Sequence, residues 1–87
     1  DEVVLQVPTW ALLEGDTVTL RCRGRGDTSI TQVWFHHEGK ELWGSLKGTE
    51  MSLPPLGLQD GGRYRCAGKV GFWPGRKESA AVTVTVH

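Results

Sequence analysis

The sequence has 87 residues, which is enough for one domain, and we expect a single domain over residues 1–87. Hydrophobic residues make up 38% of the chain and charged residues 23%, a balance typical of a folded globular protein rather than a disordered one. Ten basic and ten acidic side chains cancel. The net positive field that attracts nucleic acid is therefore absent, and no apolar run is long enough to insert into a membrane.

Short segments in which apolar and polar residues alternate dominate the chain, and none shows the spacing of an amphipathic helix. Twelve glycines and four prolines separate them, as turns separate strands. In chain order, the predicted strands are 3–7, 17–23, 30–37, 41–42, 50–53, 63–68 and 81–86. Residues 43–47 look irregular, residues 56–61 are predicted to form a crossing loop, and residues 70–77 a glycine-rich loop. About seven short strands at this spacing predict an all-β antiparallel sandwich of two sheets.

The two cysteines, Cys22 and Cys66, lie far apart in the sequence. They are too few and too distant for a zinc finger. A disulfide between them would stabilise the fold by about 4 kcal/mol in the chain-entropy model and would imply an oxidising compartment. The alternative is two unrelated buried thiols in a cytosolic protein. No signal peptide opens the chain, so we expect either a cytosolic protein or a mature fragment, and the small size favours the second.

The predicted strand 30–37 carries two candidates for the core aromatic. Phe35 shares a face with Val33, whereas Trp34 lies on the opposite face, because successive side chains of a strand point to opposite sides. Val33 and Phe35 form the more core-like pair. We therefore predict that Phe35 is buried and that Trp34 faces out of the sheet.

Asp60, Gly62, Tyr64 and Cys66 form a pattern that resembles the tyrosine corner of immunoglobulin domains, in which the tyrosine hydroxyl bonds back to the backbone. Longer stretches are similar to membrane-distal ectodomain modules of the Fc receptors and Fc receptor-like proteins: LQVP at 5–8, LEGDTVTLRCRG at 13–24 and GRYRC at 62–66. The resemblance implies an immunoglobulin-like sandwich with a Cys22–Cys66 disulfide between the sheets. It also implies neighbouring immunoglobulin domains and a place outside the plasma membrane, or in the secretory lumen.

In the Fc receptors, ligand contact comes from three segments of the second domain, which correspond here to residues 25–29, 42–47 and 71–76. The resemblance therefore gives these candidate ligand-binding residues: Arg25, Asp27, Trp43, Lys47, Phe72, Trp73 and Arg76. Arg25 stands where Fc-binding modules commonly carry a tryptophan that clasps a proline of the antibody, so that clasp is not predicted. The chain contains no asparagine and hence no N-glycosylation sequon, which leaves its faces open to protein contact.

Four tryptophans are too many for one small core. Trp43 and Trp73 fall in predicted loops near arginines, a combination typical of the centres of protein interfaces. Trp10 lies near the N-terminal junction, and we expect it to pack against an adjoining domain.

The tripeptide Arg25-Gly26-Asp27 matches the integrin-ligand motif and lies in a predicted exposed loop. A metal-bound integrin site could accept the Asp27 carboxylate. The alternative is a solvated loop, because a three-residue match often arises by chance.

Two rows of arginines alternate with inward-facing residues. One contains Arg21, Arg23 and Arg25, and the other Arg63 and Arg65. They belong to different sheets in the immunoglobulin arrangement, so they do not merge into a nucleic-acid patch. We expect solvated faces, with electrostatic steering of a partner as the functional alternative.

No set of residues predicts catalysis. His36, His37 and Glu38 are adjacent, so their side chains diverge and do not form a metal site. No serine has an evident base beside it. Residues 68–75 lack the phosphate-binding pattern GxxxxGK[ST], so no cofactor is predicted.

The sequence therefore predicts a non-catalytic extracellular recognition module of an Fc receptor-like immune-cell receptor. Its ligand would be an immunoglobulin or another immune-cell surface protein. The alternatives are a structural spacer in a multi-domain receptor and an integrin-binding adhesion ligand.

Overall fold

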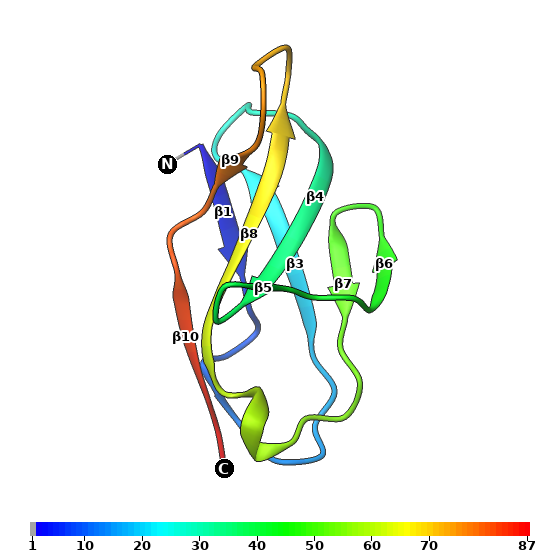
Figure 1. The fold of residues 1–87 in the computed structure, drawn as a ribbon, viewed down its shortest axis with the longest axis vertical. Helices are drawn as coiled ribbons and strands as arrows, with labels where there is room; N and C mark the ends of the chain where they lie inside the picture. The colour runs from blue at the N-terminus through cyan, green and yellow to red at the C-terminus, as the bar shows by residue number, and fades with distance from the viewer. Residues whose placement is uncertain (1) are drawn as a thin grey trace.

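The computed structural model describes residues 2–87, which form two β-sheets packed face to face in a body of 40 × 22 × 21 Å (Figure 1). The first sheet has the order β1-β3-β7-β6, in which the strands are β1 (Val3–Gln6), β3 (Thr19–Gly24), β7 (Glu50–Ser52) and β6 (Ser45–Lys47). The second has the order β2-β10-β8-β4-β5, formed by β2 (Ala11–Leu12), β10 (Val82–Val86), β8 (Gly62–Val70), β4 (Ile30–His37) and β5 (Lys40–Glu41). A further strand, β9 (Lys77–Glu78), pairs with β8. A 3-10 helix, η1 (Leu58–Asp60), comes directly before β8 in the sequence. The predicted all-β two-sheet fold is confirmed.

Three of the ten strands in residues 2–87, namely β2, β6 and β9, were not predicted from the sequence. After Pro8 the chain crosses to the second sheet, where β2 pairs in parallel with the end of β10. The prediction that residues 43–47 are irregular is wrong for residues 45–47, because β6 pairs there with β7 in antiparallel register. The predicted loop 70–77 is shorter, because β8 extends to Val70 and β9 begins at Lys77. Strands of two or three residues are too short for alternation to be visible in the sequence.

The core between the sheets is built from the inward residues of the alternating strands. Cys22 of β3 and Cys66 of β8 are fully buried and form the disulfide that joins the sheets, with their Cα atoms 5.9 Å apart. Phe35 is 0% exposed and belongs to the same apolar cluster. Trp34, the next residue back, lies on the outer side of β4 and is only partly buried. The structure thus places Phe35 inside, where the alternation put it.

The tyrosine corner ties η1 to the start of β8. The Tyr64 hydroxyl donates to the carbonyl oxygen of Asp60, and the Asp60 carboxylate accepts the Gly57 N–H at 2.7 Å. The Tyr64 ring stacks on His37, with ring centroids 4.3 Å apart. Burial, and secondarily the charge of Asp60, raise the pKa of Tyr64 to about 12, so the hydroxyl remains a donor through the physiological range.

A two-residue turn joins β4 to β5. Glu38 and Gly39 both have positive φ, at 50° and 81°, which is the backbone of a type I′ hairpin turn. The turn directs the Glu38 carboxylate toward β8, where it accepts the Arg63 backbone N–H at 2.7 Å. The hairpin therefore holds Glu38 beside Arg63 on the outer face of the second sheet.

Candidate ligand-binding surface

The loop between β3 and β4 carries Arg25 and Asp27 at one end of the molecule, and both are exposed. The Thr28 N–H donates to the Arg25 carbonyl at 3.1 Å, so the tripeptide lies in a tight turn with Gly26 at a φ of 60°. The Arg25 N–H donates to the Glu2 carbonyl at 2.9 Å. This loop is anchored to the start of β1 while its side chains remain in solvent.

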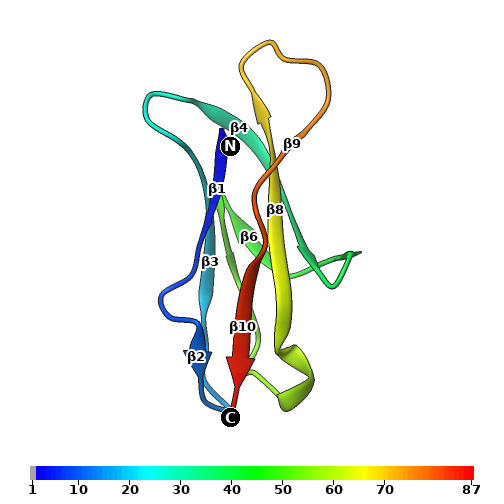
Figure 2. The same ribbon diagram turned by 90° about the vertical axis from the view of Figure 1, so that its left-hand side faces the viewer.

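The loop between β8 and β9 projects from the same end (Figure 2). Phe72 is fully exposed and Trp73 is 54% exposed. The loop is held down by two cation–π contacts: the Arg76 guanidinium lies 3.7 Å from the centre of the Trp34 ring, and the Lys77 ammonium lies 3.8 Å from that of Trp73. Contacts of this kind contribute roughly 0.5–1 kcal/mol each at exposed sites. The outward-facing Trp34 thereby connects this loop to the sheet.

Trp43 lies between β5 and β6, where the chain passes from the second sheet to the first (Figure 1). It is 84% exposed, and Leu46 beside it is half exposed. Both line a hollow of about 340 Å³ between the sheets, together with Trp34 and the buried Met51. Lys47 is exposed at the end of β6. The hollow therefore has an apolar base, and the exposed indole of Trp43 lies at its edge.

The structure brings some predicted residues together and separates others. Trp43 shares the hollow with Trp34, whose ring carries Arg76, so these three form one connected flank. Arg25 and Asp27 do not join it, because their loop diverges from the β8–β9 loop in Figure 2. The sequence did not identify Leu46 or the contact of Trp34 with Arg76. The only signal for Leu46 was a single apolar residue between Ser45 and Lys47.

Trp10 is 72% exposed, but it does not lie at the N-terminal end of the body. Its carbonyl accepts the Thr85 N–H at 2.8 Å, next to the parallel pairing of β2 with β10. The expectation of a place near the N-terminal junction is therefore wrong, since the crossing after Pro8 carries Trp10 to the opposite end.

Within residues 2–87, no group of three His, Cys, Asp or Glu side chains is arranged to hold a metal ion. In the same residues, no helix is long and apolar enough to cross a membrane.

Comparison with known proteins places this fold in a family. The model of the immunoglobulin domain matches residues 2–86. The chain belongs to the immunoglobulin domain family. The mouse protein "Fc receptor-like A" is 39% identical over 89 residues, covering 100% of this chain and 25% of its own length. The human "Low affinity immunoglobulin gamma Fc region receptor II-b" is 33% identical over 85 residues, covering 98% of this chain and 27% of its own length.

The chain thus spans about a quarter of the length of these relatives. Among solved structures, the second Ig-C2 domain of human Fc receptor-like A superposes with a TM-score of 0.74 at 18% identity. That match covers 99% of this chain and 96% of that one and shows a shared fold. The resemblance to Fc receptor-like immunoglobulin domains is confirmed, and the chain is a receptor-type immunoglobulin module.

Proposed function

We propose that this chain is a non-catalytic recognition module of a larger extracellular receptor, and that it binds a protein of the immune system. The observation that carries the proposal is that Trp43, Leu46 and Trp73 remain in solvent, while Arg76 lies over the Trp34 ring that lines the same hollow as Trp43. Large aromatic side chains flanked by arginine are enriched where protein interfaces gain most of their binding energy. A folded domain that leaves such residues in water gains stability by covering them with a partner.

The partner class follows from the relatives. One of them is named as a receptor for the immunoglobulin gamma Fc region, which supports an immunoglobulin or another immune-cell surface protein as ligand. Arg25 occupies the place of the tryptophan that clasps a proline of the antibody. We therefore expect contact through the Trp43 hollow and the β8–β9 loop rather than through that clasp. Signalling would belong to other parts of the receptor.

A binding screen tests the proposal. The oxidised 87-residue chain is presented to immunoglobulin isotypes and to a panel of immune-cell surface proteins, beside the Trp43→Ala/Trp73→Ala double variant. We expect a saturable signal that the double variant loses. The matched control is Trp10→Ala, which removes an indole that is also largely exposed but lies away from Trp43 and Trp73, beside the end of β10. Binding that survives the double variant would refute the assigned surface, and a folded domain that binds nothing would refute the function.

A second candidate is a structural spacer, because exposed Trp10 and Leu13 lie beside the end of β10. An adjoining domain of the parent chain could cover them. In that case the Trp10→Ala variant of a longer ectodomain loses stability, while its ligand binding is unchanged. This outcome separates a spacer surface from a ligand surface.

A further inference from the structure

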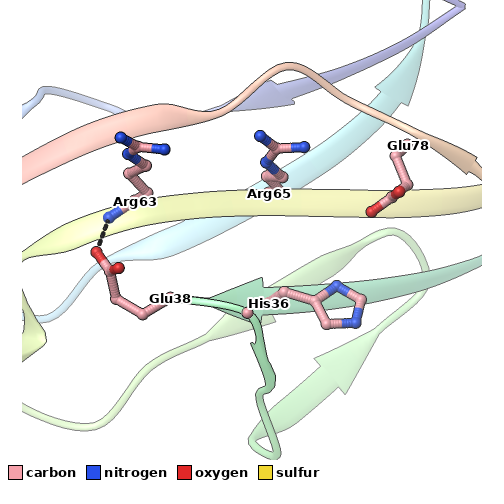
Figure 3. Close-up of a pocket in the computed structure, with 6 residues that line it drawn as sticks. His36, Glu38, Arg63, Arg65 and Glu78 are labelled. Carbon is pink, nitrogen blue, oxygen red and sulfur yellow. Dashed lines mark hydrogen bonds between the residues drawn. The ribbon is translucent and has the colours of Figure 1, made fainter.

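The outer face of the second sheet contains a polar hollow of about 490 Å³ that the function above does not use. Figure 3 shows its walls, which are His36 of β4, Glu38 and Gly39 of the β4–β5 turn, Arg63 and Arg65 of β8, and Glu78 of β9. We propose that this hollow is a second docking site and that it receives the carboxylate of an acidic residue in a protein segment. The site lies on the sheet face, away from Trp43 and the β3–β4 loop.

The two arginines are neighbours on one face of β8. Arg63 and Arg65 are two residues apart, so their side chains point to the same side, and both are exposed. Figure 3 shows the two guanidinium groups side by side. Further along, Ala67 faces the same way but is covered, since it pairs in register with Trp34, over which Arg76 lies. The cationic row thus continues from the hollow toward the β8–β9 loop.

The strand register sets different side chains against these arginines from those set against the arginines of the other sheet. The Glu38 Oε2 is engaged by the Arg63 backbone N–H, which is the hydrogen bond drawn in Figure 3. Arg65 lies directly opposite His36, whereas Arg21 of β3 lies opposite Glu50. Directly opposed side chains in antiparallel strands have Cβ atoms about 5 Å apart, so register decides which charges are paired. Arg21 faces a carboxylate across its ladder, and Arg65 does not.

His36 adds an unsatisfied polar atom to the wall. Its Nδ1 is buried and has no hydrogen-bond partner among residues 2–87. Because this atom is buried, a ligand in the hollow meets the rest of the imidazole ring and not Nδ1. A carboxylate placed against the guanidinium groups of Arg63 and Arg65, which lie side by side in Figure 3, can accept hydrogen bonds from both. Arginine binds carboxylates with two parallel hydrogen bonds, which sets the orientation of the acid as well as its position.

The charges around the hollow favour a protein segment over a polyanionic sugar chain. Glu38 and Glu78 also line the hollow, so a ligand with many closely spaced sulfates would be repelled by them. An extended peptide with a single glutamate two residues from a lysine on either side complements the whole pattern, because alternate side chains point to the same face and its lysines then face Glu38 and Glu78.

The test is an NMR titration of the oxidised, isotope-labelled 87-residue chain. The probe is the blocked pentapeptide acetyl-Lys-Gly-Glu-Gly-Lys-amide, and the matched probe is acetyl-Lys-Gly-Gln-Gly-Lys-amide. We expect saturable shifts of the Arg63 and Arg65 side-chain signals and of the His36 ring with the glutamate probe, with a dissociation constant of about 1–10 mM. The glutamine probe should bind about tenfold more weakly, because it cannot form charge-assisted hydrogen bonds. Binding should weaken as salt is added.

The variant Arg63→Gln/Arg65→Gln should abolish the shift of His36. Its control, Arg21→Gln/Arg23→Gln, removes two arginines at the same spacing from the other sheet and should leave the titration unchanged. A heparin-derived tetrasaccharide serves as the competing probe. The proposal is overturned if neither peptide saturates, if both peptides bind equally, if the two double variants behave alike, or if the tetrasaccharide binds this face more tightly than the peptide.

Discussion

Replacing Tyr64 with phenylalanine should change how stability depends on pH. The Tyr64 hydroxyl donates to the Asp60 carbonyl, and its pKa is raised to about 12 from an unfolded value of about 10. A raised pKa means that the folded state holds the proton more tightly. The resulting stability is therefore fully present below about pH 10 and is lost as the pH rises from 10 to 12.

The magnitude follows from linkage. At pH 11, a folded-state pKa two units above the unfolded one lowers the free energy of unfolding of the native protein by about 1.4 kcal/mol relative to neutral pH. Solvent screening at the partly buried hydroxyl reduces this loss to about 1 kcal/mol. At pH 8, Tyr64→Phe should be less stable than the native protein by about 1 kcal/mol, the usual net contribution of one hydrogen bond. The two stabilities should therefore converge near pH 11.

Equilibrium urea denaturation of both proteins at a series of pH values measures this convergence, because other titrating groups are common to both and cancel. Tyr64 is the one tyrosine of the chain, so the tyrosinate absorbance band also reports its pKa directly. A constant stability difference between pH 8 and 11, or a tyrosinate pKa near 10 in the folded protein, would refute the assignment of the corner.

Three other perturbations give distinct outcomes. Phe35→Ala removes a fully buried ring and should lower the free energy of unfolding by about 3–5 kcal/mol, whereas Trp34→Ala should lower it by about 1–2 kcal/mol. Unfolding followed by circular dichroism measures both losses, and the reverse order would mean that Trp34 is the core aromatic. Replacing both Cys22 and Cys66 with alanine should lower the free energy of unfolding by about 4 kcal/mol, and a loss below about 1 kcal/mol would contradict the loop-closure argument. Asp27→Glu should leave cation-dependent integrin adhesion unchanged if the turn is a solvated loop, and loss of adhesion would instead establish the adhesion function.

The sequence was sufficient for the parts of the fold that depend on local pattern. Alternation located the long strands and separated Phe35 from Trp34, because the side-chain period of a strand is two. The spacing of Tyr64 and Cys66 was enough to predict the tyrosine corner and, through the family resemblance, the disulfide. The short strands β2 and β6 were missed because their partners, rather than their own residues, specify them.

The candidate surfaces were less predictable because they depend on register between distant strands. Arg76 reaches Trp34 only because the β8–β9 loop folds back onto β4. The opposition of Arg65 to His36 is set by the pairing of β4 with β8, and an offset of one residue would place different side chains together. Residue types thus indicated which side chains were available, and only the structure showed which of them meet.

The central claim is that the surface around Trp43 binds a protein ligand. Comparing the dissociation constants of the Trp43→Ala and Trp10→Ala variants tests it most directly. For a ligand found in the binding screen, Trp43→Ala should raise the dissociation constant about 30-fold, the equivalent of about 2 kcal/mol expected of an interface hot spot. Trp10→Ala should change it less than about threefold, within the range of residues outside the contact. The opposite ranking, with Trp43→Ala silent and Trp10→Ala weakening binding, would contradict the account and place the ligand at the other end of the domain.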